Sequence, residues 1–414
     1  MYELRPYQQK AVDFALQRFE KDTKPMLMVA PTGSGKTWII AEIAKRWEGK
    51  VLVLTVSKEL CQQDAEKLQI VCGKDMTGIY SASWGKKEIK EITVATIQSA
   101  YKHPELWDEF SLIIVDEVEA TNLDGMLGEL VKGKKVIGLT ATPYASVGSR
   151  RGRWYTTKLW PMHKVKSKKY GWYWQPCEYI ISEKELLDEG YLSPLKIYST
   201  PERCGILRLA SNGSEYEKES IERWVSQVLF RIMQVMTGAE GKGWVSSGIV
   251  FMPSVESCES LEKICAQFNI DAKAVHHKTP AEIRDKIIAD HKSGKLRWLI
   301  NQGVATRGFD NPKVDCLIIA RPTASLRLHR QMIGRGVRVA PGKFGCTILD
   351  LTENCKRWGG LLDVEMGKKG WEDTILLRGE NISGMEVSKI DLTRNKRKEN
   401  KDGNGTDANS NQNL

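Results

Sequence analysis

Short apolar runs alternate with longer amphipathic stretches along the first third of the chain. The apolar runs lie at Met26–Ala30, Val51–Thr55, Ile92–Ala95, Leu112–Asp116 and Val136–Leu139. Helical spacing of apolar positions covers Lys36–Trp47 and Lys58–Leu68. Because buried strands separated by helix-length segments form βαβ units, this region is predicted to contain a parallel sheet covered by helices.

The same alternation returns after residue 245. Strands are predicted at Gly248–Phe251, Ala272–Val275, Trp298–Ile300, Cys316–Ile319 and Cys346–Leu351. Helices are predicted at Val255–Phe268, Pro280–Lys292 and Leu326–Val337, with Glu215–Met236 as the helix that opens this half. The chain is therefore predicted to be an α/β protein with two lobes, each built on a parallel sheet.

These patterns divide the chain into five segments. Lobe 1 is predicted over residues 1–143 and lobe 2 over residues 215–385. A basic and aromatic insertion occupies 144–192, and a crossover linker occupies 193–214. Residues 386–414 are predicted to be a disordered tail, because the stretch from Asp391 to Leu414 contains no aromatic side chain and is dominated by Asn, Lys and Asp.

Charge narrows the choice of partners. The 414 residues include 62 Lys and Arg against 52 Asp and Glu, which gives a net charge of +10. Such an excess favours a polyanionic partner, most often nucleic acid. A membrane partner is not expected, because no run of 18 apolar residues occurs and the first ten residues lack the apolar core of a signal peptide. The protein is expected to be located in the cytoplasm of a bacterium or of a phage-infected cell.

Nine cysteines are scattered singly, and no two have the spacing of a zinc or redox motif. They are expected to be reduced thiols in the core.

A phosphate-binding loop is predicted at residues 30–37, which read APTGSGKT between a strand and a helix. The glycines Gly33 and Gly35 allow backbone N–H groups to turn toward phosphates at the start of the helix. Lys36 is expected to reach the β- and γ-phosphates of ATP, and Thr37 to bind Mg²⁺. Pro31, Thr32 and Ser34 complete the loop.

The apolar strand that begins at Leu112 ends in two adjacent carboxylates, Asp116 and Glu117. Asp116 is expected to hold Mg²⁺ through water, and Glu117 to orient and deprotonate the attacking water. The histidines His163, His276 and His277 show no metal-ligand spacing.

With both elements in place, the chain resembles the superfamily-2 helicases and translocases from residue 4 to about residue 351. Seven further segments match in order: residues 4–8 (LRPYQ), 53–60, 96–99 (TIQS), 140–143 (TATP), 249–251, 306–310 (TRGFD) and 331–338 (QMIGRGVR). The resemblance implies two tandem RecA-like lobes with ATP in the cleft between them. It looks closest to RadD-type repair helicases and to phage branch-migration helicases of the UvsW kind.

The resemblance also implies roles for individual residues. Arg335 and Arg338 would act as arginine fingers that reach ATP when the lobes close. Gln8 would bond the adenine edge. The other implied nucleotide contacts are Arg5, Gly308, Asp310 and Gln331, and the implied nucleic-acid contacts are Thr96, Gln98 and Thr306.

Two features depart from these relatives. Glu119 stands where they usually carry His or Asp, which puts the strength of coupling to the neighbouring motifs in doubt. The cysteine cluster of RadD-type proteins is absent, so no zinc module is inferred.

The insertion at 144–192 is the part of the chain that differs most from a general helicase motor. Residues 144–177 contain 8 Lys or Arg and 8 Trp or Tyr but no acidic residue. Cations beside aromatic faces are typical of single-strand binding, which makes Lys166, Lys168, Lys169, Trp172 and Trp174 candidate nucleic-acid contacts. The alternative is that the aromatic residues pack this segment onto lobe 1.

The sequence thus predicts an ATP-dependent DNA helicase that unwinds or remodels branched DNA in repair, recombination or replication, with ATP and Mg²⁺ as cofactors. Two alternatives stay open. One is a double-strand translocase subunit beside a nuclease or methylase, and the other is an ATP-switched clamp, possibly on RNA. Protein partners and the preference between DNA and RNA are not determined by the sequence.

Overall fold

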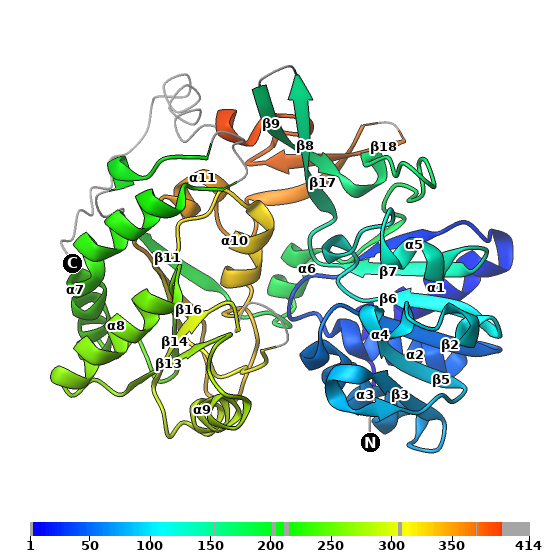
Figure 1. Ribbon diagram of the computed structural model, residues 1–414, viewed down its shortest axis with the longest axis horizontal. Coiled ribbons are helices and arrows are strands. Elements are labelled where there is room, and N and C mark those ends of the chain that lie inside the picture. The colour runs from blue at the N-terminus through cyan, green and yellow to red at the C-terminus, as the bar shows by residue number, and fades with distance from the viewer. Residues whose placement is uncertain are drawn as a thin grey trace.

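Two α/β lobes lie side by side in the computed structural model (Figure 1), as the apolar pattern predicts. The structure describes residues 3–151, 154–200, 204–210, 215–304, 309–369 and 371–390. The predicted fold class is confirmed. In the described part of the chain, no helix is long and apolar enough to cross a membrane.

Lobe 1 is built on an eight-stranded sheet in the order β10-β1-β7-β6-β2-β5-β3-β4. All neighbours pair in parallel except β3 and β4. The strands are β1 (Met26–Val29), β2 (Lys50–Thr55), β3 (Thr77–Ser81), β4 (Lys86–Lys87), β5 (Ile92–Thr96), β6 (Phe110–Val115), β7 (Lys135–Thr140) and β10 (Tyr179–Ile180). The helices are α1 (Pro6–Lys21), α2 (Lys36–Arg46), α3 (Lys58–Cys72), α4 (Ile97–Ala100) and α5 (Met126–Val131).

Both faces of this sheet are buried, which is why its strands read as continuous apolar runs. Met26 and Met28 of β1 face the core shared with α1, α2 and α3. Leu27 and Val29, one position along, face the opposite core beside α4 and α5. The period of two along the strand therefore supplies apolar side chains to two helix layers at once.

Lobe 2 is built on six parallel strands in the order β11-β16-β15-β12-β14-β13. They are β11 (Leu195–Ser199), β12 (Gly248–Phe251), β13 (Ala272–His276), β14 (Trp298–Gln302), β15 (Cys316–Ile319) and β16 (Cys346–Asp350). The helices are α7 (Lys218–Gly241), α8 (Val255–Gln267), α9 (Ala281–Ser293), α10 (Leu326–Ile333) and α11 (Asn354–Trp358).

Three predicted boundaries are wrong. The segment predicted as a linker contains β11, whose five residues pair in register with β16, so the second sheet takes its edge strand from before residue 215. The segment predicted as one insertion, 144–192, contributes β10 to the first sheet and then forms α6 (Glu183–Asp188). The tail begins later than residue 386, because Val387 and Ile390 are buried. Residues 391–414 lie outside the described part.

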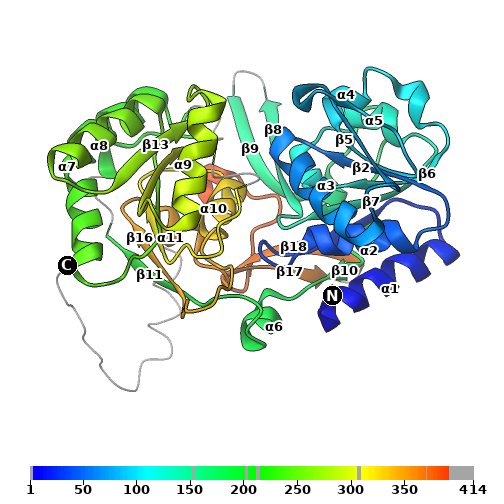
Figure 2. The same cartoon turned by 90° about the horizontal axis from the view of Figure 1, so that it is seen from below.

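A third unit joins the lobes and is named here the bridging β-module. Its first part is the hairpin β8 (Tyr144–Arg151) and β9 (Trp154–Pro161), which follows lobe 1 directly. Its second part is the sheet β17 (Val364–Lys369), β18 (Glu372–Leu377) and β19 (Glu380–Asn381), which follows lobe 2. In Figure 1 both parts lie above the boundary between the lobes, and Figure 2, seen from below, shows the hairpin near the middle of the molecule.

A shared core holds the bridging β-module together. Tyr144 and Leu159 of the hairpin pack with Ile375 and Leu377 of the C-terminal sheet and with Trp358 of α11. The backbone of β9 also exchanges hydrogen bonds with residues 384–385. Two segments separated in sequence by the whole of lobe 2 therefore form one unit between the lobes.

The nine cysteines are all free thiols, and eight are buried, as expected. No cluster of three or more His, Cys, Asp or Glu residues able to hold a metal ion occurs among the described residues.

Trp172 and Trp174 differ in a way that the sequence does not show. Trp174 is only 5% exposed and packs in the core of lobe 1, where its ring lies against Gly138 of β7. Trp172 is 61% exposed. The prediction that Trp174 stacks on nucleic acid is therefore wrong: its ring is core packing.

We expect Trp174→Ala to lower the free energy of unfolding by about 3–5 kcal/mol, because it leaves a large cavity in a packed core. Trp172→Ala is the matched control and should change stability by no more than about 0.5 kcal/mol. Urea denaturation of both variants measures the difference. Equal losses would contradict the packing described here.

Candidate active site

The loop after β1 has the backbone of a phosphate cradle. Gly33 and Gly35 adopt φ angles of 87° and 77°, in the left-handed region that glycine enters without strain. A Cβ at Gly35 would lie 2.5 Å from Nε2 of Gln8. The turn places Lys36 and Thr37 in the first turn of α2, whose unpaired N–H groups and dipole favour an anion.

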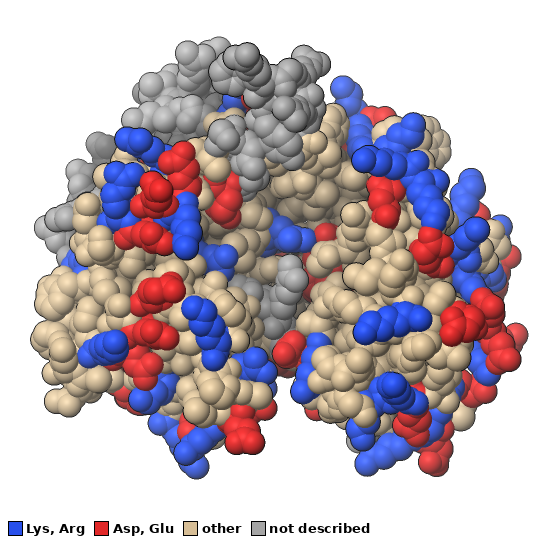
Figure 3. Space-filling view, in the orientation of Figure 1, with Lys and Arg blue, Asp and Glu red and all other residues tan. Residues whose placement is uncertain are grey.

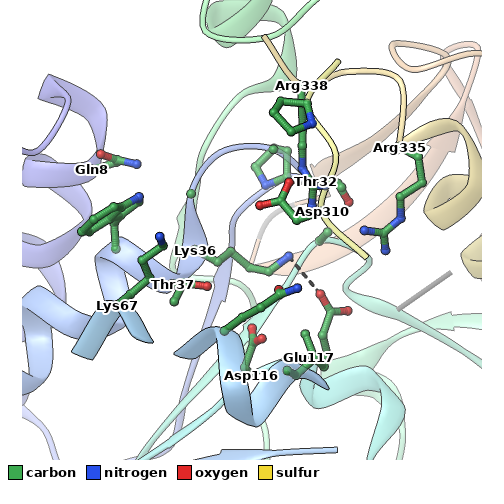
Figure 4. Close-up of a pocket in the computed structure, with 18 of the residues that line it drawn as sticks. Gln8, Thr32, Lys36, Thr37, Lys67, Asp116, Glu117, Asp310, Arg335 and Arg338 are labelled. Carbon is green, nitrogen blue, oxygen red and sulfur yellow. Dashed lines mark ion pairs between the residues drawn. The ribbon is translucent and has the colours of Figure 1, made fainter. Parts of the chain in front are cut away.

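Lys36 pairs with the carboxylate of Glu117 across this loop. Its Nζ lies 3.1 Å from Oε1 of Glu117, as the dashed line in Figure 4 shows. Glu117 follows the end of β6 with a φ of 52°, a left-handed conformation that is unusual for a residue with a Cβ. Burial alone would raise the pKa of Glu117, but the Lys36 ammonium outweighs it, and the pKa is about 2. Glu117 is therefore ionised.

The oxygen atoms beside this pair fit a hard divalent cation. Asp116 is 3% exposed, and its Oδ1 has no hydrogen-bond partner among the described residues. Burial and the Glu117 charge raise the pKa of Asp116 to about 7. Thr37 adds a hydroxyl on the same side of the cavity. Two carboxylates and a hydroxyl are the donor set that Mg²⁺ prefers, so the site has the chemistry to hold Mg²⁺.

Two arginines form the opposite wall. Arg335 and Arg338 follow α10 in lobe 2, and each donates a hydrogen bond to the carbonyl oxygen of Phe309, at 2.6 and 3.0 Å. Arg338 also lies 2.6 Å from Oδ1 of Asp310. Burial and the charge of Arg338 lower the pKa of Arg335 to about 9. The guanidinium therefore stays charged near neutral pH, and it points toward Lys36 and Glu117 (Figure 4).

These walls enclose a cavity of about 670 Å³ between the lobes, and the surface in Figure 3 is hollowed along the same boundary. Most of the predicted nucleotide-site residues line it: Arg5, Gln8, Pro31, Thr32, Gly33, Gly35, Lys36, Thr37, Asp116, Glu117, Asp310, Gln331, Arg335 and Arg338. Ser34, in the same loop, is buried and does not line the cavity. Gly308 and Thr306 lie outside the described residues.

Gln8 supports the loop as well as lining the cavity. Its Nε2 donates to the carbonyl oxygen of Ser34 at 2.9 Å, and its Oε1 accepts from the backbone N–H of Arg5 at 3.0 Å. Tyr7 donates to the same Ser34 carbonyl at 2.7 Å. The start of α1 therefore fixes the shape of the phosphate loop, which the motif alone did not predict.

Three further residues lie at or beside the cavity, and no sequence motif marks them. Trp38 and Lys67 line the cavity, with the Lys67 ammonium 5.0 Å from the Trp38 ring. Asp64 of α3 is fully buried and lies beside Thr37 and Asp116. Burial and the nearby Asp116 raise the pKa of Asp64 well above its usual value. A charged residue on the apolar face of α3 was the available signal.

Glu119, where related helicases usually carry His or Asp, contacts both the TATP segment and lobe 2. Its Oε1 accepts from Oγ1 of Thr142 at 3.1 Å, within the TATP segment. Its carbonyl oxygen accepts from Nη1 of Arg327 at 3.0 Å, across the boundary between the lobes. Arg330, also on α10, pairs with Glu183 of α6. Two residues of α10 in lobe 2, Arg327 and Arg330, therefore contact the segment after β6 and the helix α6.

The predicted nucleic-acid residues do not form one group. Thr96 is 4% exposed, and its hydroxyl donates to Ser99, so the expected contact by its side chain is wrong. Gln98 is exposed on α4. Lys166 and Lys168 are exposed in the loop after β9, and Lys169 there pairs with Glu129 of α5.

Comparison with known families agrees with this architecture. Residues 1–145 match the family described as the res subunit of type III restriction enzymes, and residues 231–340 match the helicase conserved C-terminal domain. The chain belongs to the superfamily-2 helicases. The two matches fall on lobe 1 and lobe 2 in that order, as the motifs predicted.

Similar proteins come from several sources. The protein irc3 of Schizosaccharomyces pombe, named as a mitochondrial ATP-dependent helicase, is 30% identical over 86% of this chain and 58% of its own length. A 51.5 kDa protein of a Lactococcus phage is 26% identical over 84% of this chain and 69% of its own length. The chain thus spans between half and about two thirds of these relatives.

Among solved structures, a fragment of an HsdR subunit of a type I restriction enzyme from Vibrio vulnificus superposes with a TM-score of 0.65. It is 19% identical, and the match covers 92% of this chain and 68% of the fragment. This likeness supports the two-lobed helicase fold.

Substitutions of Lys36 and Glu117, both in the lobe 1 wall of the cavity, should affect ATP turnover differently. Lys36→Ala should abolish ATP turnover, because the loop loses its phosphate-binding cation. Glu117→Gln should keep nucleotide affinity near that of the wild type while hydrolysis slows by at least about 100-fold, the usual contribution of a general base. Nucleotide binding and single-turnover hydrolysis measure the two effects. Near-normal hydrolysis by Glu117→Gln would remove Glu117 from the base role.

Arg335→Ala and Arg338→Ala should reduce the rate of ATP turnover far more than the affinity for ATP, because a finger acts mainly on the transition state. Steady-state kinetics with a nucleotide-binding assay separates the two quantities. If either variant loses affinity while its maximal rate is kept, that arginine is a ground-state contact. Lys45→Ala, at the exposed end of α2, is a matched control that should change neither.

Proposed function

We propose that the protein is an ATP-driven motor that couples hydrolysis to translocation along DNA and to the unwinding or remodelling of branched DNA. The observation that supports this most directly is the divided cavity. Lys36 and Glu117 face Arg335 across the boundary between two lobes that are otherwise separate sheets. A site assembled from two bodies responds to their relative position, which is the requirement for converting hydrolysis into movement.

ATP would first change the partner of Lys36. The phosphates of ATP compete with Glu117 for the Lys36 ammonium, which now lies 3.1 Å from the carboxylate. Once Lys36 turns to the phosphates, Glu117 loses the charge that holds its pKa at about 2. Its carboxylate becomes more basic and is free to accept a proton from the attacking water.

Thr37 and Asp116 would hold Mg²⁺, which supplies charge stabilisation to the phosphates when bound. Arg335 and Arg338 would offset the charge that develops on the transferred phosphoryl group. Both arginines now bond to the carbonyl of Phe309, beside the segment predicted to contact nucleic acid. A shift of that segment on nucleic-acid binding would therefore move the arginines.

A double-strand translocase that works beside a nuclease or methylase is the second candidate. Its support is the match of lobe 1 to the restriction-enzyme res subunit family and the fold shared with an HsdR fragment. A clamp on RNA that hydrolyses ATP slowly is a third outcome of the test below.

ATPase rates with single-stranded, duplex and forked DNA and with RNA, measured beside strand and triplex displacement, separate these functions. We expect forked or single-stranded DNA to give the largest stimulation, together with strand displacement. Triplex displacement without strand displacement would favour the translocase. Stimulation by RNA alone, without displacement, would contradict the DNA motor.

The basic loop after β9 is proposed as part of the nucleic-acid contact. Lys166→Ser and Lys168→Ser should each flatten the slope of log affinity against log salt for single-stranded DNA by about 0.7, the value for one lost phosphate contact. Both side chains are exposed, so basal ATPase activity should be unchanged. Lys45→Ser serves as the control. An unchanged salt slope would show that these lysines do not contact phosphate.

A further inference from the structure

A second cavity, of about 460 Å³, lies between the loop after β9 and the C-terminal sheet. Its volume is within the range of small-ligand pockets. Three tryptophans contribute to its lining together with a few polar groups. The full set is Trp160, His163, Lys164, Trp172, Trp174, Gln175, Pro176 and Glu372.

The walls of this cavity are held by packing. Trp174 is fixed in the core of lobe 1. The ring of Trp160 lies so close to Gly384 that a Cβ there would be 2.6 Å from it. Trp172, 61% exposed, is the ring that remains open to solvent. Two rings are therefore preformed, and the third presents an accessible face.

A buried carboxylate lies behind the lining residue His163. Asp373 of β18 is fully buried and accepts a hydrogen bond from the backbone N–H of Cys177 at 2.6 Å. Lys368 lies 2.9 Å from the same carboxylate, and His163 lies 3.3 Å from it. Burial opposes this charge, but His163 and the other donors outweigh it and lower the pKa of Asp373 to about 2. The carboxylate thus links the loop to the C-terminal sheet.

One polar atom at this cavity is unsatisfied. The side chain of His163 is 9% exposed, and its Nε2 has no hydrogen-bond partner among the described residues. A buried polar nitrogen without a partner costs free energy unless a ligand or water completes it. His163 therefore supplies a group that a polar ligand edge could bond.

We propose that this cavity binds one unpaired nucleobase of single-stranded DNA, stacked on Trp172 with its polar edge toward His163 and Gln175. The proposal rests on the proposed function and names a contact within it. A base in a duplex has both faces covered by its neighbours, so only an unpaired base can enter. The bases of a single strand stack on aromatic rings without regard to sequence.

Charge favours a nucleotide over an acidic or neutral peptide. Glu372 is already paired with Lys164 at 2.7 Å. The loop that supplies His163 and Lys164 also carries Lys166 and Lys168, which are exposed. Lys and Arg side chains gather over β18 and this loop at the upper right of Figure 3. A basic loop beside the cavity therefore suits the phosphates of a strand whose base is bound.

The cavity also joins parts that belong to different lobes. The tryptophans follow lobe 1 in the chain, whereas Glu372 and Asp373 belong to the sheet that follows lobe 2. A base held here would be sensitive to the position of the bridging β-module between the lobes.

The test compares two fluorescently labelled 20-nucleotide strands, oligo-dT and an abasic strand with the same phosphates, in anisotropy titrations with the full chain. Trp172→Ala should weaken binding of oligo-dT by about 5- to 150-fold, the range for one lost base–aromatic stack. Binding of the abasic strand should be unchanged. Trp172→Tyr should restore most of the loss.

Phe230→Ala, which removes a ring 51% exposed on α7, is the matched control and should leave both affinities unchanged. Wild-type affinity for oligo-dT in Trp172→Ala, or an equal loss for both strands, would overturn the base site and leave the motor function standing. Failure of the wild-type chain to bind either strand, without ATPase stimulation by any DNA, would contradict the motor function as well.

Discussion

Charges of opposite sign face one another across the cavity between the lobes, and the rest of the active site is arranged around that separation. Glu117 and Asp116 end a strand of lobe 1, and Arg335 and Arg338 follow a helix of lobe 2. Lys36 balances the acidic side, and the Phe309 carbonyl holds the basic side. The site therefore contains the groups for phosphoryl transfer, but they belong to two bodies. Under the proposed function, hydrolysis depends on how the lobes are placed.

Several contacts fix that placement in this structure. Arg327 bonds to the Glu119 carbonyl, and Arg330 pairs with Glu183 in a buried position. Removing one partner of a buried pair leaves an uncompensated charge, which makes such pairs sensitive to movement. The bridging β-module adds an apolar connection from both lobes. Together these contacts provide a physical route by which movement at the nucleic-acid side could reach the arginines.

The phosphate loop and the adjacent carboxylates were predictable because each is formed by consecutive residues. A turn that needs glycine at 33 and 35, followed by Lys36 and Thr37, has few alternative explanations, and buried parallel strands read directly as apolar runs. Contacts distant in sequence were not predictable in this way. The position of Asp64 on the apolar face of α3 signals an unusual carboxylate but not its neighbours, and the sequence does not distinguish the exposed Trp172 from the buried Trp174. The bridging β-module joins a hairpin before lobe 2 to a sheet after it, so no local pattern signals it.

In the proposed motor, nucleotide state and nucleic-acid binding are coupled through one cavity between the lobes. The affinity for single-stranded DNA, measured without nucleotide, with a non-hydrolysable ATP analogue and with ADP at one salt concentration, tests this coupling most directly. We expect the affinities to differ by about 5- to 150-fold between states, and DNA to shift the affinity for the analogue by the same factor. Equal DNA affinities in all three states would contradict it.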